Sequence, residues 1–167
     1  MKVVNVGIIG GGLMGKEVAG AFGRWFSLND YPVKVELKAV CDLDANTLKW
    51  YEQIPSVELL TTDYKELLAS AKVDVVYVAL PHFLHEQYYI EVIEAGKDLL
   101  AEKPFGMDLK AAKKINEKIA SSKSFVRCCS EMPFLPGPQR VISEALSGRI
   151  GEIIEINAGF CHSSDMD

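Results

Sequence analysis

The chain has 167 residues, of which 49% are hydrophobic and 25% are charged, and its formal net charge is −5. A chain of this length and composition forms a globular domain with a sizeable core that needs neither disulfides nor metals. The negative charge argues against a nucleic-acid partner, because binding to a phosphate backbone needs a basic surface.

The N-terminal segment predicts a buried strand, then a tight turn and a helix. Residues 3–9 form an apolar run that ends at three glycines. Because this run is too short to cross a membrane and no cleavage signal follows it, we expect a cytoplasmic protein without membrane contacts. A helix is expected from about Met14 to Ser27, and one face of it carries Val18, Phe22, Trp25 and Phe26.

Further strand-like segments alternate with helical ones. Strands are expected at residues 33–41, near 57–60, and at 73–80, 98–102 and 125–131. Helix N-caps are expected at Asp44, Asp63 and Asp108, and a helix C-cap at Gly96. The apolar positions expected to face inward are Leu48 and Trp50; Leu84, Tyr88, Val92 and Ala95; Leu109, Ala112, Ile115 and Ile119; and Val141, Ile142, Ala145 and Leu146.

This alternation predicts an α/β fold with a doubly wound parallel sheet, the Rossmann fold, with right-handed crossovers. We expect a dinucleotide-binding domain at residues 1–130 and a hinge loop with a helix at 131–150. Residues 151–160 alternate strictly between polar and apolar, which predicts a half-exposed antiparallel strand. Residues 151–167 would then be the start of a truncated second α/β domain, with only its first strand present. Such an unpaired strand is expected to be disordered or to pair with another copy.

Three glycines near the N-terminus form the first functional motif. Gly10, Gly12 and Gly15 make a G-x-G-x-x-G sequence between the first strand and the first helix. In this setting the first glycine allows a sharp turn, the second lets the backbone approach a pyrophosphate, and the third lets helix and strand pack closely. The alternative is a tight turn without a ligand.

Asp42 follows the second predicted strand. An acidic residue there can bind both ribose hydroxyls of an adenosine and would repel a 2′-phosphate, so it favours NAD and makes NADP less likely. The alternative is a solvated turn aspartate or a helix cap, but Asp44 is the better candidate for the cap.

Glu102, Lys103 and Pro104 follow the fifth strand, at the sheet edge where ligands bind in such folds. A lysine there can give or take the proton of a substrate hydroxyl while hydride moves, and Glu102 could hold it. From composition alone, a solvated lysine is the simpler interpretation.

These motifs together resemble the Gfo/Idh/MocA oxidoreductases. The resemblance rests on GIIGGGLMG, on Asp42, on PHFLH after the fourth strand, on AEKP after the fifth, and on SGRIGEI near the end. It implies that Lys103 is catalytic and that Pro104 follows a cis peptide bond. It implies that the cofactor is contacted by Gly10, Gly12, Leu13, Met14, Gly15, Asp42, Leu80, Pro81, His85, Glu102, Lys103 and Pro104. A position on the helix surface or in the N-terminal turn of the helix is the alternative for His85, and His162 and Asp165 receive no catalytic role.

The resemblance implies hydride transfer between NAD and a hydroxyl carbon of a sugar, inositol or related polyol. The family's second domain supplies most of the substrate pocket, and the full-length form is expected to be a homo-oligomer. This chain alone is therefore expected to hold the cofactor without completing the reaction. The alternatives are a non-catalytic NAD-binding or redox-sensing module and, less favoured because of AEKP, a methyltransferase that binds S-adenosylmethionine. The cysteines, Cys41, Cys128, Cys129 and Cys161, are expected to be reduced, and no metal site is expected.

Overall fold

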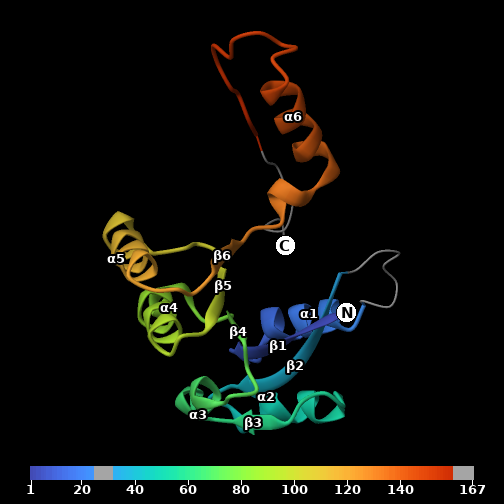
Figure 1. The fold of residues 1–167 in the computed structure, drawn as a ribbon, viewed down its shortest axis with the longest axis vertical. Coiled ribbons are helices and arrows are strands. Elements are labelled where there is room, and N and C mark those ends of the chain that lie inside the picture. The colour runs from blue at the N-terminus through green and yellow to red at the C-terminus, as the bar shows by residue number, and fades with distance from the viewer. Residues whose placement is uncertain (25–31, 160–167) are drawn as a thin grey trace, which may run out of the picture. The chain divides into compact units, whose positions relative to one another are not determined.

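The residues that the structure describes form one six-stranded sheet, parallel throughout. The structure is a computed structural model that describes residues 1–24 and 32–159. The strands lie in the order β3-β2-β1-β4-β5-β6 (Figure 1). Their bounds are β1 Lys2–Ile9, β2 Val33–Cys41, β3 Leu59–Thr61, β4 Val75–Val78, β5 Asp98–Glu102 and β6 Val126–Cys129. The order reverses between β1 and β4, which is the Rossmann arrangement, so the predicted doubly wound sheet is confirmed.

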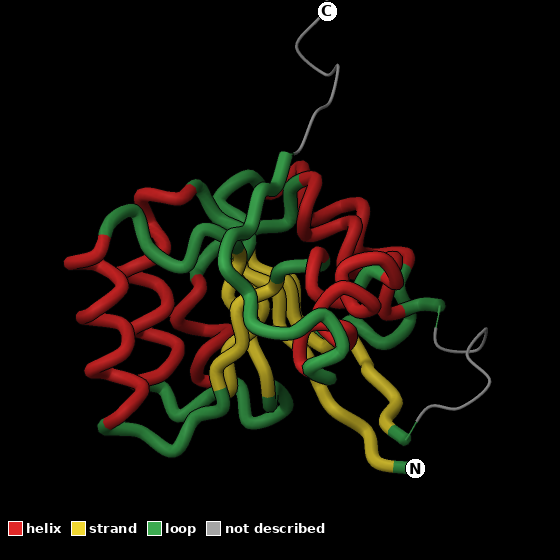
Figure 2. Tube along the Cα trace, turned by 90° about the horizontal axis from the view of Figure 1, so that it is seen from above, coloured by secondary structure: helices red, strands yellow, loops and turns green. Residues whose placement is uncertain are grey.

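Helices cover both faces of this sheet (Figure 2). One face packs against α1 (Leu13–Phe22), α2 (Ala45–Leu48) and the 3₁₀ helix η2 (Lys49–Gln53). The other face packs against α3 (Tyr64–Ala69), α4 (His85–Glu94) and α5 (Leu109–Ala120). A short 3₁₀ helix, η3 (His82–Leu84), leads directly into α4.

The two cores follow from the alternation of side chains along each strand. Ile8 packs with the α1 side and its neighbour Ile9 with the α4 side. In the same way Tyr77 faces the α1 side, while Val76 and Val78 face the α4 side. Strands buried on both faces need continuous apolar runs, which is why these segments could be recognised in the sequence.

The predicted helix caps are confirmed. The carboxylates of Asp44, Asp63 and Asp108 accept hydrogen bonds from backbone N–H groups in the first turns of α2, α3 and α5. Gly96 follows α4 with φ of +71°, the left-handed conformation that glycine adopts without strain.

Several predicted inward faces were wrong in detail. In α4 the buried side chains are His85, Tyr89, Val92 and Ile93, whereas Ala95 is exposed. In α5, Ile115 is buried as predicted, whereas Leu109, the first residue of the helix, is 71% exposed and Ala111 is buried rather than Ala112. After α2, Tyr51 is buried rather than Trp50.

The first helix also differs from its expected length. It ends at Phe22 rather than Ser27, and Val18 and Phe22 pack on the core as expected. Trp25 and Phe26 lie outside the described residues.

Residues 130–159 belong to a second compact unit, separate from the unit of residues 1–129. This second unit contains the 3₁₀ helix η4 (Met132–Phe134) and α6 (Pro136–Leu146). The strand predicted at 151–160 was wrong as far as the described residues go, because residues 151–159 have no strand and Ile154 is 97% exposed. A strand needs a neighbour for its backbone hydrogen bonds, and none is paired with this segment in the described part of the chain.

The apolar positions of α6 are also more exposed than predicted. Val141, Ile142 and Leu146 are all exposed, and Ala145 is half-buried. No helix in residues 1–24 and 32–159 is long and apolar enough to span a membrane.

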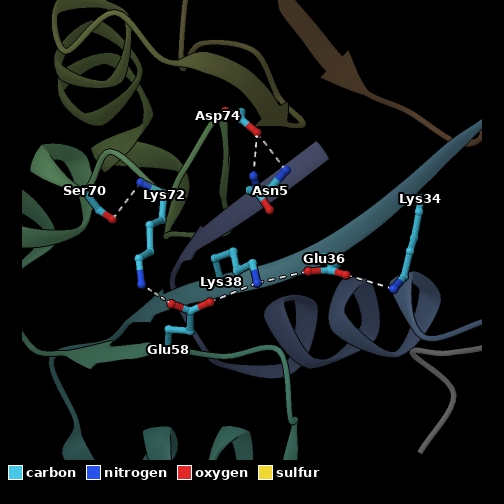
Figure 3. A network of polar contacts seen from close by, with 8 residues as sticks. All are labelled: Asn5, Lys34, Glu36, Lys38, Glu58, Ser70, Lys72 and Asp74. Carbon is cyan, nitrogen blue, oxygen red and sulfur yellow. Dashed lines mark hydrogen bonds and ion pairs between the residues drawn. The ribbon is translucent and has the colours of Figure 1, made fainter. Parts of the chain in front are cut away.

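A network of ion pairs lies near the amino ends of the strands (Figure 3). Lys38 of β2 contacts both Glu36 and Glu58, each at 3.0 Å, and Glu58 also pairs with Lys72. Hydrogen bonds from Lys34 and then Lys38 hold the pKa of Glu36 below its usual range, and those from Lys72 and then Lys38 do the same for Glu58. We refer to this group as the amino-edge network; the carboxyl ends of the strands hold the residues described next.

Candidate functional site

The glycine loop between β1 and α1 has a shape that only glycines allow. Gly10 has φ of +98°, and a Cβ placed on it would lie 2.3 Å from the Ala79 carbonyl oxygen. A Cβ on Gly15 would lie 2.3 Å from the Gly10 carbonyl oxygen, so loop and helix are in close contact there. At Gly12, by contrast, a Cβ would meet nothing within 4 Å. Two glycines therefore serve internal packing, and the middle one leaves an open backbone surface.

The start of α1 leaves its backbone N–H groups available to an anion. Gly12 is the N-cap residue, no side chain caps the helix, and no acidic residue occurs in its first turn. Uncapped N–H groups and the helix dipole favour an anion at such an end. Leu13 and Met14, the other residues of this turn expected to contact the cofactor, both have exposed side chains.

Asp42 lies beside this loop, just beyond β2. One carboxylate oxygen, Oδ2, accepts a hydrogen bond from the Gly11 N–H at 2.8 Å, and Oδ1 accepts one from the Asp44 N–H at 2.9 Å. Asp44 is the cap of α2, as predicted, so Asp42 is left without that task. Each carboxylate oxygen retains further lone pairs, so Asp42 can also accept hydrogen bonds from hydroxyl groups.

Tyr51 holds the glycine loop in place by a hydrogen bond to it and was not identified from the sequence. It is fully buried, and its hydroxyl donates to the Gly11 carbonyl at 3.1 Å. Burial, followed by the nearby charge of Asp42, raises the pKa of Tyr51 well above its ordinary value, so the hydroxyl stays a donor. The sequence pattern predicted its neighbour Trp50 as the buried residue of this segment, and it carries no local signal that indicates the role of Tyr51.

A pocket of about 360 Å³ opens between the glycine loop, Asp42 and the end of β4. This size is within the range of small-molecule sites. Of the predicted site residues, Gly10, Gly12, Asp42, Leu80 and Pro81 line it. The structure adds residues that sequence reasoning missed, namely Leu43, Thr62, Tyr64, Leu84 and Tyr88.

Tyr64 and Tyr88 form an aromatic pair in the wall of this pocket. Their ring centroids lie 4.8 Å apart, and the Tyr64 hydroxyl donates to Glu91 Oε2 at 2.5 Å. This bond, with a smaller effect of burial, raises the pKa of Tyr64 to about 12. The pair comes from α3 and α4, which are distant in sequence, so no local pattern could have indicated it.

Glu102 ends β5 and is held by two partners. Its Oε1 accepts a hydrogen bond from the Tyr77 hydroxyl at 2.7 Å, and its Oε2 accepts one from the Lys103 backbone N–H at 3.0 Å. Burial, and then the bond to Glu102, raises the pKa of Tyr77 far above its usual value. In the described residues Glu102 forms no ion pair with the Lys103 ammonium, so the idea that it holds that group directly is not supported.

Lys103 and Pro104 form an exposed segment directly after Glu102. The Lys103–Pro104 peptide bond is cis, as the resemblance implied. Both residues are exposed, and the Lys103 ammonium makes no ion pair within residues 1–24 and 32–159. A lysine side chain at this edge of the sheet is available to a bound molecule.

His85 is the first residue of α4 and is completely buried, so it lies in the N-terminal turn, as one alternative had it, and not on the helix surface. Its Nδ1 lies 2.8 Å from the Pro104 carbonyl oxygen, and its Nε2 lies 2.9 Å from the Leu80 carbonyl oxygen. The side chain thus connects the end of β4 with the segment after β5.

The comparisons with known proteins agree with this arrangement. The family model of the Gfo/Idh/MocA proteins, described as an oxidoreductase family with an NAD-binding Rossmann fold, matches residues 4–128. Levoglucosan dehydrogenase of Pseudarthrobacter phenanthrenivorans is 28% identical over 159 residues, which cover 90% of this chain and 40% of that protein. D-xylose 1-dehydrogenase (NADP(+)) of Hypocrea jecorina is 34% identical over 90 residues, which cover 54% of this chain and 23% of that protein.

The crystal structure of myo-inositol 2-dehydrogenase from Lactobacillus plantarum is similar with a TM-score of 0.77 at 26% identity. The match covers 92% of this chain and 44% of that one. The chain thus spans less than half the length of these relatives. This match to an oxidoreductase family argues against the methyltransferase alternative. From the match over residues 4–128 and the parallel sheet order, the chain belongs to the Gfo/Idh/MocA oxidoreductase family and contains its NAD-binding Rossmann fold.

Proposed function

We propose that this chain is the nucleotide-binding part of an NAD-dependent oxidoreductase that acts on a hydroxyl carbon of a sugar, inositol or related polyol. The observation that carries the proposal is the pocket at the carboxyl edge, which brings together the glycine loop, Asp42 and the end of β4. The relatives named as levoglucosan and inositol dehydrogenases support the substrate class. The substrate pocket itself would come mainly from a further part of the protein.

The residues present fit a dinucleotide. The open face of Gly12 and the uncapped start of α1 suit a pyrophosphate, since no Cβ or acidic side chain obstructs the approach. Asp42 suits the ribose hydroxyls of an adenosine, and its negative charge disfavours a 2′-phosphate. We therefore propose NAD rather than NADP, although one relative is named for NADP(+).

In this proposal Lys103 is the catalytic residue. When bound in this site, NAD would supply the hydride acceptor for oxidation of the substrate carbon. The Lys103 amine takes the proton of the substrate hydroxyl in that direction and returns it to the carbonyl oxygen during reduction. Glu102 fixes the backbone next to Lys103, since its carboxylate accepts the Lys103 N–H while Tyr77 holds its other oxygen.

Titration calorimetry of the chain with NAD tests the binding step. We expect saturable binding of NAD, with weaker binding of NADP. No heat at millimolar NAD, with the chain shown to be folded by circular dichroism, would contradict the proposal.

Turnover of polyols by the protein that includes the substrate pocket tests the catalytic step. Lys103→Ala should lower kcat by about 10²- to 10⁴-fold, the range of general acid–base catalysis, and should change NAD affinity little. Lys113→Ala is the matched control, because Lys113 is an exposed lysine on α5. NAD binding without turnover of any polyol would favour the non-catalytic module instead.

A further inference from the structure

The buried side chains of α4 contact the backbone that carries Lys103. The His85 ring lies at hydrogen-bond distance from the Pro104 carbonyl oxygen, and the Tyr89 hydroxyl donates to the Glu102 carbonyl at 2.7 Å. The two residues are four apart on one helix, so they share a face, and their rings stack with centroids 4.8 Å apart. The carbonyls on both sides of Lys103 are thus held by the same helix.

The second contact of His85 joins this segment to Leu80, just after β4, a residue that lines the pocket. The His85 Nε2 lies 2.9 Å from the carbonyl oxygen of Leu80. The His85 side chain is 0% exposed, so water does not compete for either contact. A single imidazole therefore connects the wall at the end of β4 with the segment that carries Lys103.

The chemistry of the two partners makes this arrangement specific. Both are backbone carbonyls, which can only accept hydrogen bonds, so a protonated ring nitrogen is the donor in either contact. The titratable groups facing the ring are Tyr89, which stacks on it, and His82, whose ring centroid lies 5.4 Å away. On α4 itself, Glu86 is directed to Lys114 of α5, at 2.6 Å, rather than to the ring.

We propose that His85 is a positioning residue that sets the location of the Lys103 side chain relative to the end of β4. It acts by holding the Pro104 and Leu80 carbonyls at a fixed separation, and it contacts neither hydride donor nor acceptor. The inference rests on the proposed function, because it assumes that Lys103 takes part in the reaction.

Two substitutions separate the two contacts. In His85→Asn the side-chain amide nitrogen takes the place of Nδ1 and can still donate to the Pro104 carbonyl. In His85→Gln the amide nitrogen takes the place of Nε2 and can still donate to the Leu80 carbonyl. His85→Phe fills the space without any donor, and so measures the part that is only packing.

We expect kcat to fall on the order of 10- to 100-fold in His85→Phe, the cost of displacing a reacting group by about 1 Å. His85→Asn and His85→Gln each keep one of the two contacts, so both should lose activity, though less than His85→Phe, and the KM for NAD should change little in all three. Full activity of His85→Phe would overturn the proposal, and so would full activity of either single-contact variant.

A measurement on the unaltered chain tests the contacts without relying on activity or on the folding of variants. Nitrogen-15 NMR of the histidine side chains should show that a ring N–H proton of His85 exchanges slowly with water, because the ring is buried between the two carbonyls. A ring proton that exchanges freely with water would overturn the proposed bridge. Absence of any polyol turnover in the unaltered protein would instead contradict the proposed function, and the NMR result would still decide whether the bridge exists.

Discussion

The three glycines of the loop have different surroundings, so identical substitutions should have different effects. Gly15→Ala places a methyl group 2.3 Å from the Gly10 carbonyl oxygen and 2.9 Å from the Tyr51 hydroxyl. The backbone oxygen cannot move without shifting the loop, so this change is a case of overpacking, which costs about 1–3 kcal/mol. For a chain of this size each kcal/mol lowers Tm by about 2–4 °C, so we expect Tm to fall by about 4–8 °C for a cost near 2 kcal/mol.

Gly12→Ala is the matched control for stability. Its added methyl group meets nothing within 4 Å, and its backbone, with φ of −68°, suits an L-residue. The entropic gain of about 0.4–1 kcal/mol for Gly→Ala is offset by the poor performance of alanine as an N-cap, so Tm should change by less than about 3 °C. If the backbone of Gly12 approaches the pyrophosphate, however, this variant should lose NAD affinity by about tenfold or more.

Thermal unfolding followed by circular dichroism, with calorimetric titration of NAD, measures both effects on the same samples. We expect each variant to lose a different property: Gly15→Ala should mainly lose thermal stability, and Gly12→Ala should mainly lose NAD affinity. Equal Tm values for Gly15→Ala and the unaltered chain would refute the packing argument. Undiminished NAD affinity in Gly12→Ala would refute the placement of the pyrophosphate.

Three further predictions concern single side chains. Asp42→Asn should lower NAD affinity by about 10- to 100-fold, the value of a hydrogen bond to a charged group, and should improve NADP relative to NAD; calorimetry with both nucleotides checks this, and an unchanged ratio would argue against a ribose contact. Tyr77→Phe leaves one oxygen of the Glu102 carboxylate without its donor and should reduce the free energy of unfolding by about 1–3 kcal/mol in urea titrations, whereas no change would mean that water replaces the hydroxyl. Burial raises the pKa of the Cys41 thiol to about 11, so the buried thiol should stabilise the fold fully below about pH 9, and this stabilisation should be lost as the pH rises towards 11. Over this pH range the free energy of unfolding of Cys41→Val should fall less steeply than that of the unaltered chain; equal slopes would contradict the shift.

The sequence allowed the fold to be predicted better than the details of the site. Strands such as 33–41 and 98–102 could be placed to the residue, because runs buried on both faces are apolar and end at turns. The strand at 151–160 could not, since its alternating pattern predicts one buried face but does not supply a partner for it.

Within the site, the motif residues could be recognised from the sequence, but the residues that hold them in place could not. The glycines, Asp42 and Lys103 have a fixed place relative to strand ends, which a local pattern reveals. Tyr51 and the Tyr64–Tyr88 pair contact the loop and pocket through the tertiary fold alone. His85 could be seen as a candidate, but its burial and its two carbonyl partners depend on segments on either side of it in the sequence.

The amino-edge network has a practical consequence for attaching this protein to a surface. It lies near the opposite ends of the strands from the pocket, and eight residues of β1 extend over roughly 25 Å. Lys72 belongs to it and is 70% exposed, which makes it a natural point for an immobilising tether. A sensor chip that carries the protein through this position would leave the glycine loop and the Lys103 segment facing the flowing solution.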